Sequence, residues 1–548
     1  MDVREVRQYA TIGIPVALLL VFLVYPVLSV LARGLFVGPG SPFLEVWSSP
    51  VTHRVFRFTI VQAVVSTIVT VLLGLPGGII LAKLDFRGKE LVQAAMLIPF
   101  VLPPIVVVVG FLRMFGQGGF IDSILMFVLR SDTSVLDLAS GFTGIVLAHV
   151  FYNIPLVALI VSASLERLNP EIEESADILG ANPLQKFRRI VLPHILKSIV
   201  AASLLTFLFC FMSFPIILAL GQGRYATVEV RIWSAFRFAD YGEASALALI
   251  QLIITLILSY WYVTIGRSDT NATGQTRAVK TVHFRDLRGV FQFLAALYTV
   301  FVSILIVGPI VSVFGSSFYS PITDEFTLRG FVNLVQLGSG KGLRPLINSL
   351  FYATLSTFFA VLIAIPLAYR QRFDHSRVAT VTSAITLLPL GISSITLAYG
   401  LMRAIAVPLG LSTNPWPLIV IAQTIIGLPF TVRAIEIAVK DIDRSLIEQA
   451  DLLGASRLER LFFIELPLIA PGILVGATFS FAMAIGEMSA TLFIALPQNT
   501  TLAVAIYQYL AVRKFVEAGA AALVLTLCCS AAFLSIERLS DKAAGGAL

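Results

Sequence analysis

One acidic side chain of this sequence occupies a position where a carboxylate is costly. Glu487 lies within an otherwise apolar stretch that runs from Phe479 to Leu496. A charged group that faces lipid costs roughly 2–3 kcal/mol or more, so acids in such stretches usually face a pathway or a partner. Two interpretations remain open. Glu487 lines a route through a membrane and meets a cationic solute there, or it caps and braces a helix kink after Gly486.

Two other polar side chains lie in a second apolar stretch. His149 and Asn153 are one helical turn apart and therefore share one face of a helix. They are either polar groups of a pathway or hydrogen-bonding groups between helices, and the second interpretation is favoured. The repeat described below pairs Glu487 with Ser213, so a pathway lined by both would be asymmetric. The sequence has no His/Asp cluster and no metal-ligand spacing, and we expect no catalytic residue and no metal site.

The elements that position these side chains are membrane helices. The chain is 57% hydrophobic and 13% charged, with a mean hydropathy of +0.91, whereas a soluble domain carries about twice that charge. Apolar stretches of about 20 residues are long enough to cross a bilayer as helices. Twelve recur along the chain: 12–32, 59–83, 91–113, 142–165, 197–220, 243–265, 290–314, 347–369, 378–402, 416–439, 470–495 and 516–536. We therefore predict an all-α polytopic membrane protein with about twelve transmembrane helices.

One polar pattern, E-x-A-x-x-x-G-x9-I-x-L-P, occurs twice, and its copies lie 274 positions apart, half the length of the chain. An acid follows the alanine in both copies. Such agreement indicates an internal duplication. Each copy predicts a short helix that ends at a glycine with a positive φ, followed by a second helix that leads into a membrane span. The shared residues are Glu174, Ala176, Asp177, Gly180 and Pro193 in the first copy, and Glu448, Ala450, Asp451, Gly454 and Pro467 in the second.

The duplication extends beyond the pattern. Upstream of it, matching residues are 290 positions apart, so the first half carries about sixteen extra residues near 116–141. Each half has six predicted spans, and an even number gives both halves the same orientation, as in parallel repeats. The predicted organisation is a first repeat over 1–265, a polar linker over 266–289 and a second repeat over 290–548.

The distribution of Lys and Arg predicts the orientation of the chain. These residues are in excess in the segments that share a side with the N-terminus, which places both termini and both copies of the pattern in the cytoplasm. The same residues account for the net charge of +7. Because they are spread over many loops, nucleic-acid binding is a poor interpretation of this charge.

The repeated pattern resembles the cytoplasmic "EAA" loop of the permeases of binding-protein-dependent ABC importers. This sequence departs from that loop at one position, where Ser175 and Gln449 stand in place of Ala. The resemblance implies that residues 171–193 and 445–467 are coupling loops that dock two copies of a cytoplasmic ABC ATPase. It also implies an extracytoplasmic substrate-binding protein and a location in the cell membrane. The chain has no G-x-x-x-x-G-K-[ST] phosphate-binding loop, so we expect no bound cofactor and no enzyme activity, with ATP used by the partner subunits.

The fused twelve-span form narrows the range of possible solutes. The stretches 144–155, 226–233 and 246–251 look most like the thiamine permease, whereas 485–492 and 501–507 resemble the wider group that serves thiamine, iron, sulfate and molybdate. Thiamine is therefore the expected solute, with ferric iron as the alternative and sulfate or molybdate behind both. An ion-coupled secondary transporter would leave the two identical cytoplasmic segments without a role. A membrane enzyme has no catalytic cluster to support it.

Overall fold

The computed structural model describes residues 13–36, 42–267, 282–287, 289–320, 325–335, 342–373 and 377–545, and nearly all of them are helical. Within these residues, eleven helices are long and apolar enough to cross a membrane, and a bent helix pair makes a twelfth. The predicted all-α membrane protein with about twelve spans is confirmed. Residues 1–12 and 546–548, on which the predicted cytoplasmic termini fall, lie outside the described residues.

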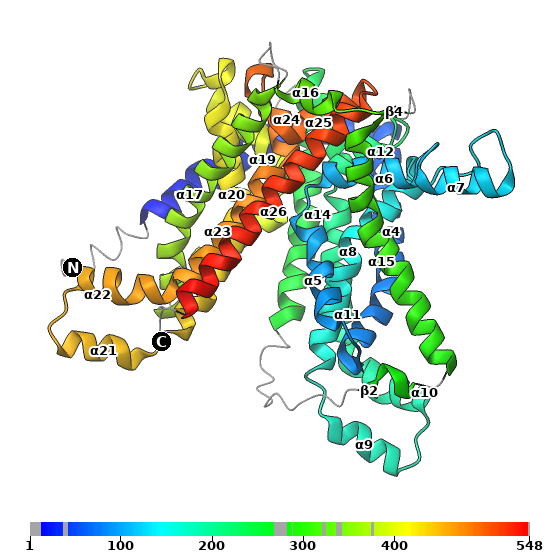
Figure 1. Cartoon of the computed structure of the whole chain (residues 1–548). Helices are drawn as coiled ribbons and strands as arrows, with labels where there is room; N and C mark the ends of the chain where they lie inside the picture. The colour runs from blue at the N-terminus through cyan, green and yellow to red at the C-terminus, as the bar shows by residue number, and fades with distance from the viewer. Residues whose placement is uncertain are drawn as a thin grey trace.

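Each half of the chain contributes six spans. The helices of the first half are α2 (Tyr25–Phe36), α4 (Pro50–Lys83), α5 (Lys89–Val101) with α6 (Pro104–Phe115), α8 (Gly141–Leu165), α11 (Leu192–Phe211) and α14 (Tyr241–Arg267). Those of the second half are α15 (Gly289–Phe318), α17 (Leu343–Phe373), α18 (Arg377–Leu387) with α19 (Ser394–Leu401), α20 (Trp416–Asp441), α23 (Leu466–Gly486) and α26 (Phe515–Gly545). Figure 1 shows two lobes: one holds α4, α8 and α11 of the first half together with α15, and the other holds α17, α20, α23 and α26 of the second half.

The duplication is visible in the short helices between these spans. Three short helices of the first half have counterparts in the second half that begin and end 274 positions later. They are α9 (Pro170–Ile178), α12 (Pro215–Leu220) and α13 (Val228–Arg237). Their counterparts are α21 (Arg444–Leu452), α24 (Ser489–Ile494) and α25 (Leu502–Ala511). Even a rare backbone conformation is repeated, because Ala239 has φ of 61° and its counterpart Arg513 has φ of 58°. The extra segment near 116–141 forms α7 (Phe120–Leu129), which stands away from the bundle at the end opposite to α9 (Figure 1).

The first helix of each half packs on the other half. Helix α15 lies against α6 as well as α26, and α2 lies against α19 as well as α14. Glycines permit this close approach: a Cβ at Gly110 would lie 2.2 Å from the carbonyl oxygen of Pro309, and a Cβ at Gly400 would lie 2.9 Å from that of Pro26. The two glycines occupy equivalent positions of the two repeats, so the same backbone contact is made twice. The predicted boundary at 265–290 therefore lies between two sequence repeats whose helices pack against each other.

The predicted linker is largely outside the described residues. Its described part includes β2 (Val282–His283), which pairs in parallel with β1 (Leu84–Asp85) at the end of α4. The side chains of His283 and Asp85 are 3.0 Å apart there. A second short ladder joins β3 (Tyr319–Ser320) to β4 (Glu325–Phe326) after α15, before α16 (Arg329–Val335). The helix α3 (Pro42–Ser48) connects the first two spans.

Several apolar segments are broken. Helices α5 and α6 are separated at Leu102 and Pro103, and the ninth span bends by 106° just before Ser394. Proline lies at both breaks, Pro103 before α6 and Pro389 before the bend, and proline lacks the N–H that a helix interior needs. The sequence predicts continuous spans over 197–220 and 470–495, and this is wrong: α11 and α23 end early, and α12 and α24 continue after a break. Proline at the start of α12 and glycine at the end of α23 account for these breaks.

Candidate coupling loops and candidate pathway

Each repeated loop begins with a capped helix. The side-chain oxygen of Asn169 accepts a hydrogen bond from the N–H of Glu171 at the start of α9, and the Asp443 carboxylate accepts one from the N–H of Ser445 at the start of α21. Such caps satisfy N–H groups that have no partner inside the helix. The hydrogen bond from the Ser445 N–H also holds the pKa of Asp443 below its usual range.

Glycine ends both helices in the same way. Gly180 has φ of +75° and Gly454 has φ of +84°, which confirms the predicted positive torsions. The N–H after each glycine reaches back to the motif alanine: Ala181 donates to the Ala176 carbonyl at 2.9 Å, and the second loop repeats this bond at 3.0 Å. No atom lies within 4 Å of a Cβ built on either glycine. The torsion, and not a lack of space, therefore requires glycine at both positions.

The acid of each motif forms an ion pair that the sequence patterns above did not reveal. Asp177 lies 2.6 Å from the amine of Lys186 in α10 (Pro183–Lys186), and Asp451 lies 2.8 Å from the guanidinium of Arg460 in α22 (Arg457–Arg460). The two bases are themselves separated by the spacing of the repeat, a signal that the sequence did contain. Because both acids are about half exposed, each pair contributes little stability. Each pair joins the two short helices of its loop.

The ends of α9 and α21 present apolar side chains to their surroundings. Four of them are between 86% and 88% exposed: Ile178, Leu179, Leu452 and Leu453. We refer to each pair as an apolar tip. The motif acids Glu174 and Glu448 lie on exposed surfaces of the same helices, whereas Ala176 and Ala450 are buried. Both tips lie at the same end of the molecule, one on each lobe (Figure 1). Exposed apolar groups in two equivalent places are typical of docking surfaces.

The Leu-Pro pair of each motif begins the next membrane helix. Pro193 and Pro467 are the second residues of α11 and α23, and each follows a π-helical turn, η2 (Phe187–Val191) or η7 (Leu461–Glu465). Proline cannot donate to the carbonyl one turn earlier, and its ring crowds that carbonyl. A widened turn relieves the crowding in both halves. The loop helices are thus joined to the spans without a flexible segment.

The geometry around Glu487 shows what its carboxylate binds. The side chain is 8% exposed and lies in the break between α23 and α24. Its oxygens accept hydrogen bonds from the N–H groups of Ala490 and Thr491, at 2.7 and 2.8 Å, and from the Thr491 hydroxyl at 2.7 Å. These N–H groups are donors at a helix start that would otherwise be unpaired. Glu487 is placed to brace α24, and its role in a pathway stays a prediction.

Glu487→Gln is expected to lower the melting temperature of the importer while uptake per folded molecule stays close to normal. The amide has one acceptor oxygen where the carboxylate has two, so a hydrogen bond of about 1–3 kcal/mol is lost. Melting temperature and uptake are measured on the same purified protein. Thr491→Val is the matched control, because it removes one of these donors and leaves the charge. A large loss of uptake in Glu487→Gln alone would show that the carboxylate meets the solute.

The other three candidate pathway residues are also buried. Ser213 lies in the break after α11, at the position equivalent to Glu487. The Nδ1 atom of His149 is 3.1 Å from the hydroxyl of Ser66 on α4, and the amide of Asn153 donates to the His149 carbonyl at 2.8 Å. The second half has the same bond between α17 and α20, where Ser356 and Gln423 are 3.1 Å apart. His149 is therefore placed to join two helices, which is the interpretation that the sequence favours.

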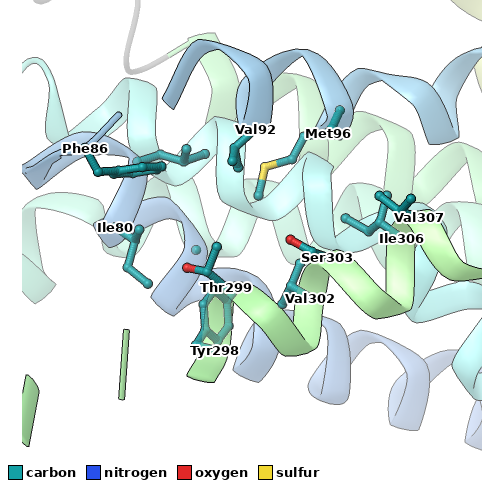
Figure 2. Close-up of a pocket in the computed structure, with 13 residues that line it drawn as sticks. Ile80, Phe86, Val92, Met96, Tyr298, Thr299, Val302, Ser303, Ile306 and Val307 are labelled. Atoms are coloured by element: carbon teal, nitrogen blue, oxygen red, sulfur yellow. The ribbon is translucent and has the colours of Figure 1, made fainter. Parts of the chain in front are cut away.

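A narrow cavity of about 50 Å³ lies between α4, α5 and α15 (Figure 2). Its lining is apolar apart from three residues of α15: Tyr298, Thr299 and Ser303. The Tyr298 hydroxyl donates to the Leu73 carbonyl of α4 at 2.6 Å. The cavity thus marks where the first helix of the second half crosses the first half. None of the four candidate pathway residues lines it.

Sequence comparisons with known proteins agree with the twofold repeat described above. The sequence model of the family described as "Binding-protein-dependent transport system inner membrane component" matches residues 74–267 and 334–545, one stretch in each half. The "Thiamine transport system permease protein" of Brucella abortus (strain 2308) is 26% identical over 528 residues, with 94% of this chain and 92% of that protein covered. The protein of the same name from Escherichia coli (strain K12) is 24% identical, with 92% of each chain covered. A "Putative ferric transport system permease protein" of Haemophilus influenzae is 26% identical, with 87% of this chain and 76% of that protein covered.

Proposed function

The chain belongs to the family of binding-protein-dependent transport system inner membrane components, and from this premise we propose that its solute is thiamine. The protein is the membrane-spanning permease of an ABC importer. The observation that carries the proposal is the match to thiamine permeases over more than nine tenths of both chains. The ferric permease is matched over a smaller share of its own length, and ferric iron is the second candidate.

One buried acid near the contact between the halves suits a cationic solute. Glu487 is a buried acid beside the contact between the halves, because a Cβ at the preceding Gly486 would lie 2.9 Å from Pro103 of the first half. A carboxylate tolerates a cation in its neighbourhood and repels sulfate or molybdate. These features support a cationic solute over an oxyanion.

The proposed partners follow from the family and the two loops. The family name itself specifies a binding protein. Two equivalent apolar tips at one end of the molecule support docking of two copies of one ATPase, which would supply all ATP hydrolysis, since the chain has no phosphate-binding loop of its own. We place the tips in the cytoplasm and the binding protein at the opposite end, with no cofactor held by this chain.

The proposed transport cycle uses the two lobes as moving bodies. In Figure 1 the lobes diverge toward α9 and α21 and meet at the end that carries α24 and α25. Closure of two ATPase subunits would draw α9 and α21 together. The rigid caps, glycine breaks and ion pairs of the loops would then pass this movement to α11 and α23.

Thiamine uptake tests the assignment of the solute. The permease, its ATPase and its binding protein are reconstituted in liposomes, and labelled thiamine is supplied on the side of the binding protein. We expect ATP-dependent accumulation of thiamine that excess ferric iron or molybdate does not reduce. Accumulation of ferric iron without thiamine uptake would assign the chain to the second candidate.

A further inference from the structure

Helix α7 belongs to the extra segment of the first half, and the proposed transport cycle does not use it. It follows α6 after a turn that contains three glycines. In this turn Gly118 has φ of +66°, and the N–H of Gly119 donates to the Gly116 carbonyl at 2.8 Å. At the equivalent place the second half has a short turn that contains η6 (Leu411–Thr413). In Figure 1 α7 runs sideways from the bundle, across the direction of the spans. The duplication therefore gives no role to α7.

One face of α7 is apolar and exposed. Phe120, Ile124, Phe127 and Val128 are 62%, 47%, 85% and 66% exposed. Their spacing of i, i+4, i+7 and i+8 places them on one side of the helix. We refer to these four residues as the α7 stripe. A contiguous apolar surface of this kind usually meets a partner or a membrane.

The opposite face of α7 is covered by the chain that follows the helix. Asp122 lies on this face and is 1% exposed. Its carboxylate accepts hydrogen bonds from the N–H groups of Val135 and Leu136, at 2.9 and 2.8 Å, and from the N–H of Gly118 at 2.9 Å. One buried side chain thus holds the segments before and after α7, and it leaves the α7 stripe as the uncovered face.

The position of α7 places this stripe at the boundary of the membrane. The segment leaves α6 at Phe115 and returns to it, because the N–H of Leu138 donates to the Phe115 carbonyl at 2.9 Å. In Figure 1 the helices α16, α24 and α25 extend beyond α7 at the end opposite to the apolar tips, and the loop after α7 rises on their side of the helix. Since Asp122 binds this loop, the stripe faces the other way, toward the lipid around the spans.

We propose that α7 is an interfacial helix whose stripe inserts into the phospholipid leaflet on the side away from the apolar tips. Helices of this kind lie in the membrane plane, with the apolar face buried about 5–10 Å into the boundary between headgroups and acyl chains. The end of α7 fits this position, because Arg130 is exposed and its long side chain can keep the charge among the headgroups. The proposal does not depend on the identity of the solute.

The inserted helix would anchor one lobe. Helix α7 packs against α6, and α6 carries Gly110, whose contact with the Pro309 backbone holds α15. Insertion of the stripe fixes the depth of α6 and α15 in the bilayer. The short turn between α19 and α20 offers no such helix, so the anchor acts on the first half alone.

The test measures the depth of the stripe in a bilayer. The full-length permease without Cys210, Cys528 and Cys529 receives one cysteine, at Phe127 or at Ile124. The cysteine is labelled with a fluorescent probe in detergent, and the protein is reconstituted in phosphatidylcholine liposomes that contain spin-labelled lipid. We expect a spin label near the headgroup to quench both probes more strongly than a spin label near the end of the acyl chain. Because the headgroup layer is hydrated, Phe127→Cys still reacts with a soluble thiol reagent from that side.

Two matched positions serve as controls. Leu72 is 67% exposed in the middle of α4, and a probe there should be quenched more strongly by the deeper spin label. Asp132 is exposed in the polar loop after α7, and a probe there should be quenched by neither lipid. Co-purification of the ATPase with each labelled variant shows that the permease is folded.

Three results would overturn the proposal. Probes at Phe127 and Ile124 that are quenched no more than the probe at Asp132 would exclude insertion into lipid. Stronger quenching by the deeper spin label, as at Leu72, would make α7 part of a span. Shielding of the Phe127 probe by the binding protein, without quenching by lipid, would assign the stripe to that protein instead.

Discussion

Replacing both Gly180 and Gly454 by valine is expected to abolish uptake and co-purification of the ATPase, while the protein remains in the membrane. Both glycines have a positive φ, which a β-branched residue strongly resists. The strain costs about 1–3 kcal/mol at each site, and a helix that unwinds by one turn escapes it. The bonds from Ala181 to Ala176 and from Ala455 to Ala450 would then be lost, and each apolar tip would change its direction.

Gly410→Val is the matched control for this double variant. Gly410 has φ of +69° and no atom within 4 Å of a Cβ, so the substitution imposes a similar strain with no clash. It lies in the turn between α19 and α20, far along the chain from the first coupling loop and one span before the second. We expect this variant to bind the ATPase normally. Normal ATPase binding by the double variant would contradict the assignment of the loops.

Single cysteines at Leu179 and Leu453 are expected to react fully with a thiol reagent applied from the cytoplasmic side, and to be protected completely when the ATPase is bound. The two side chains are 86% and 88% exposed, so nothing in the described part of the chain shields them. Protection of both positions by one ATPase preparation would support two docked copies. Labelling is followed by mass increase in a background without Cys210, Cys528 and Cys529.

A cysteine at Phe127 on α7 provides the control for sidedness. Phe127 is 85% exposed, like the tips, but α7 lies at the end opposite to α9 (Figure 1). It should react only with reagent from the outer side and should show no protection by the ATPase. Reaction of Leu179→Cys and Leu453→Cys from opposite sides of the membrane would rule out a parallel duplication.

The conformation of the two repeated loops could be predicted from the sequence because it is local. A glycine that ends a helix, a cap shortly before the motif acid and a proline at the start of a span each act within one or two helical turns. The duplication then shows that the pattern is not accidental. The ion pairs of Asp177 and Asp451 were missed although their bases repeat at the same spacing, because one base is Lys186 and the other is Arg460, and a pattern of identical residues leaves them out.

The centre of the molecule could not be predicted in the same way. Glu229 stands in a segment with several other charges, between Arg224 and Glu243, and composition alone makes such a segment an outer loop. Its side chain is nevertheless 1% exposed, because α13 packs against α14 and against α19 of the other half. The packing of α2 on α19 and of α15 on α6 likewise depends on contacts between the halves. Hydropathy and local motifs carry no information on such contacts.

The two glycine contacts have a mechanical consequence. Gly110 against Pro309 and Gly400 against Pro26 are contacts of backbone on backbone, which cannot adjust by changing rotamers as side-chain contacts do. In Figure 1 α15 lies beside α4, so the Gly110 contact holds the first helix of the second half within the lobe of the first half. Helix α15 also packs against α26, which lies in the other lobe. When the lobes move, α15 must therefore slide along α26, because its backbone contact with α6 cannot give way.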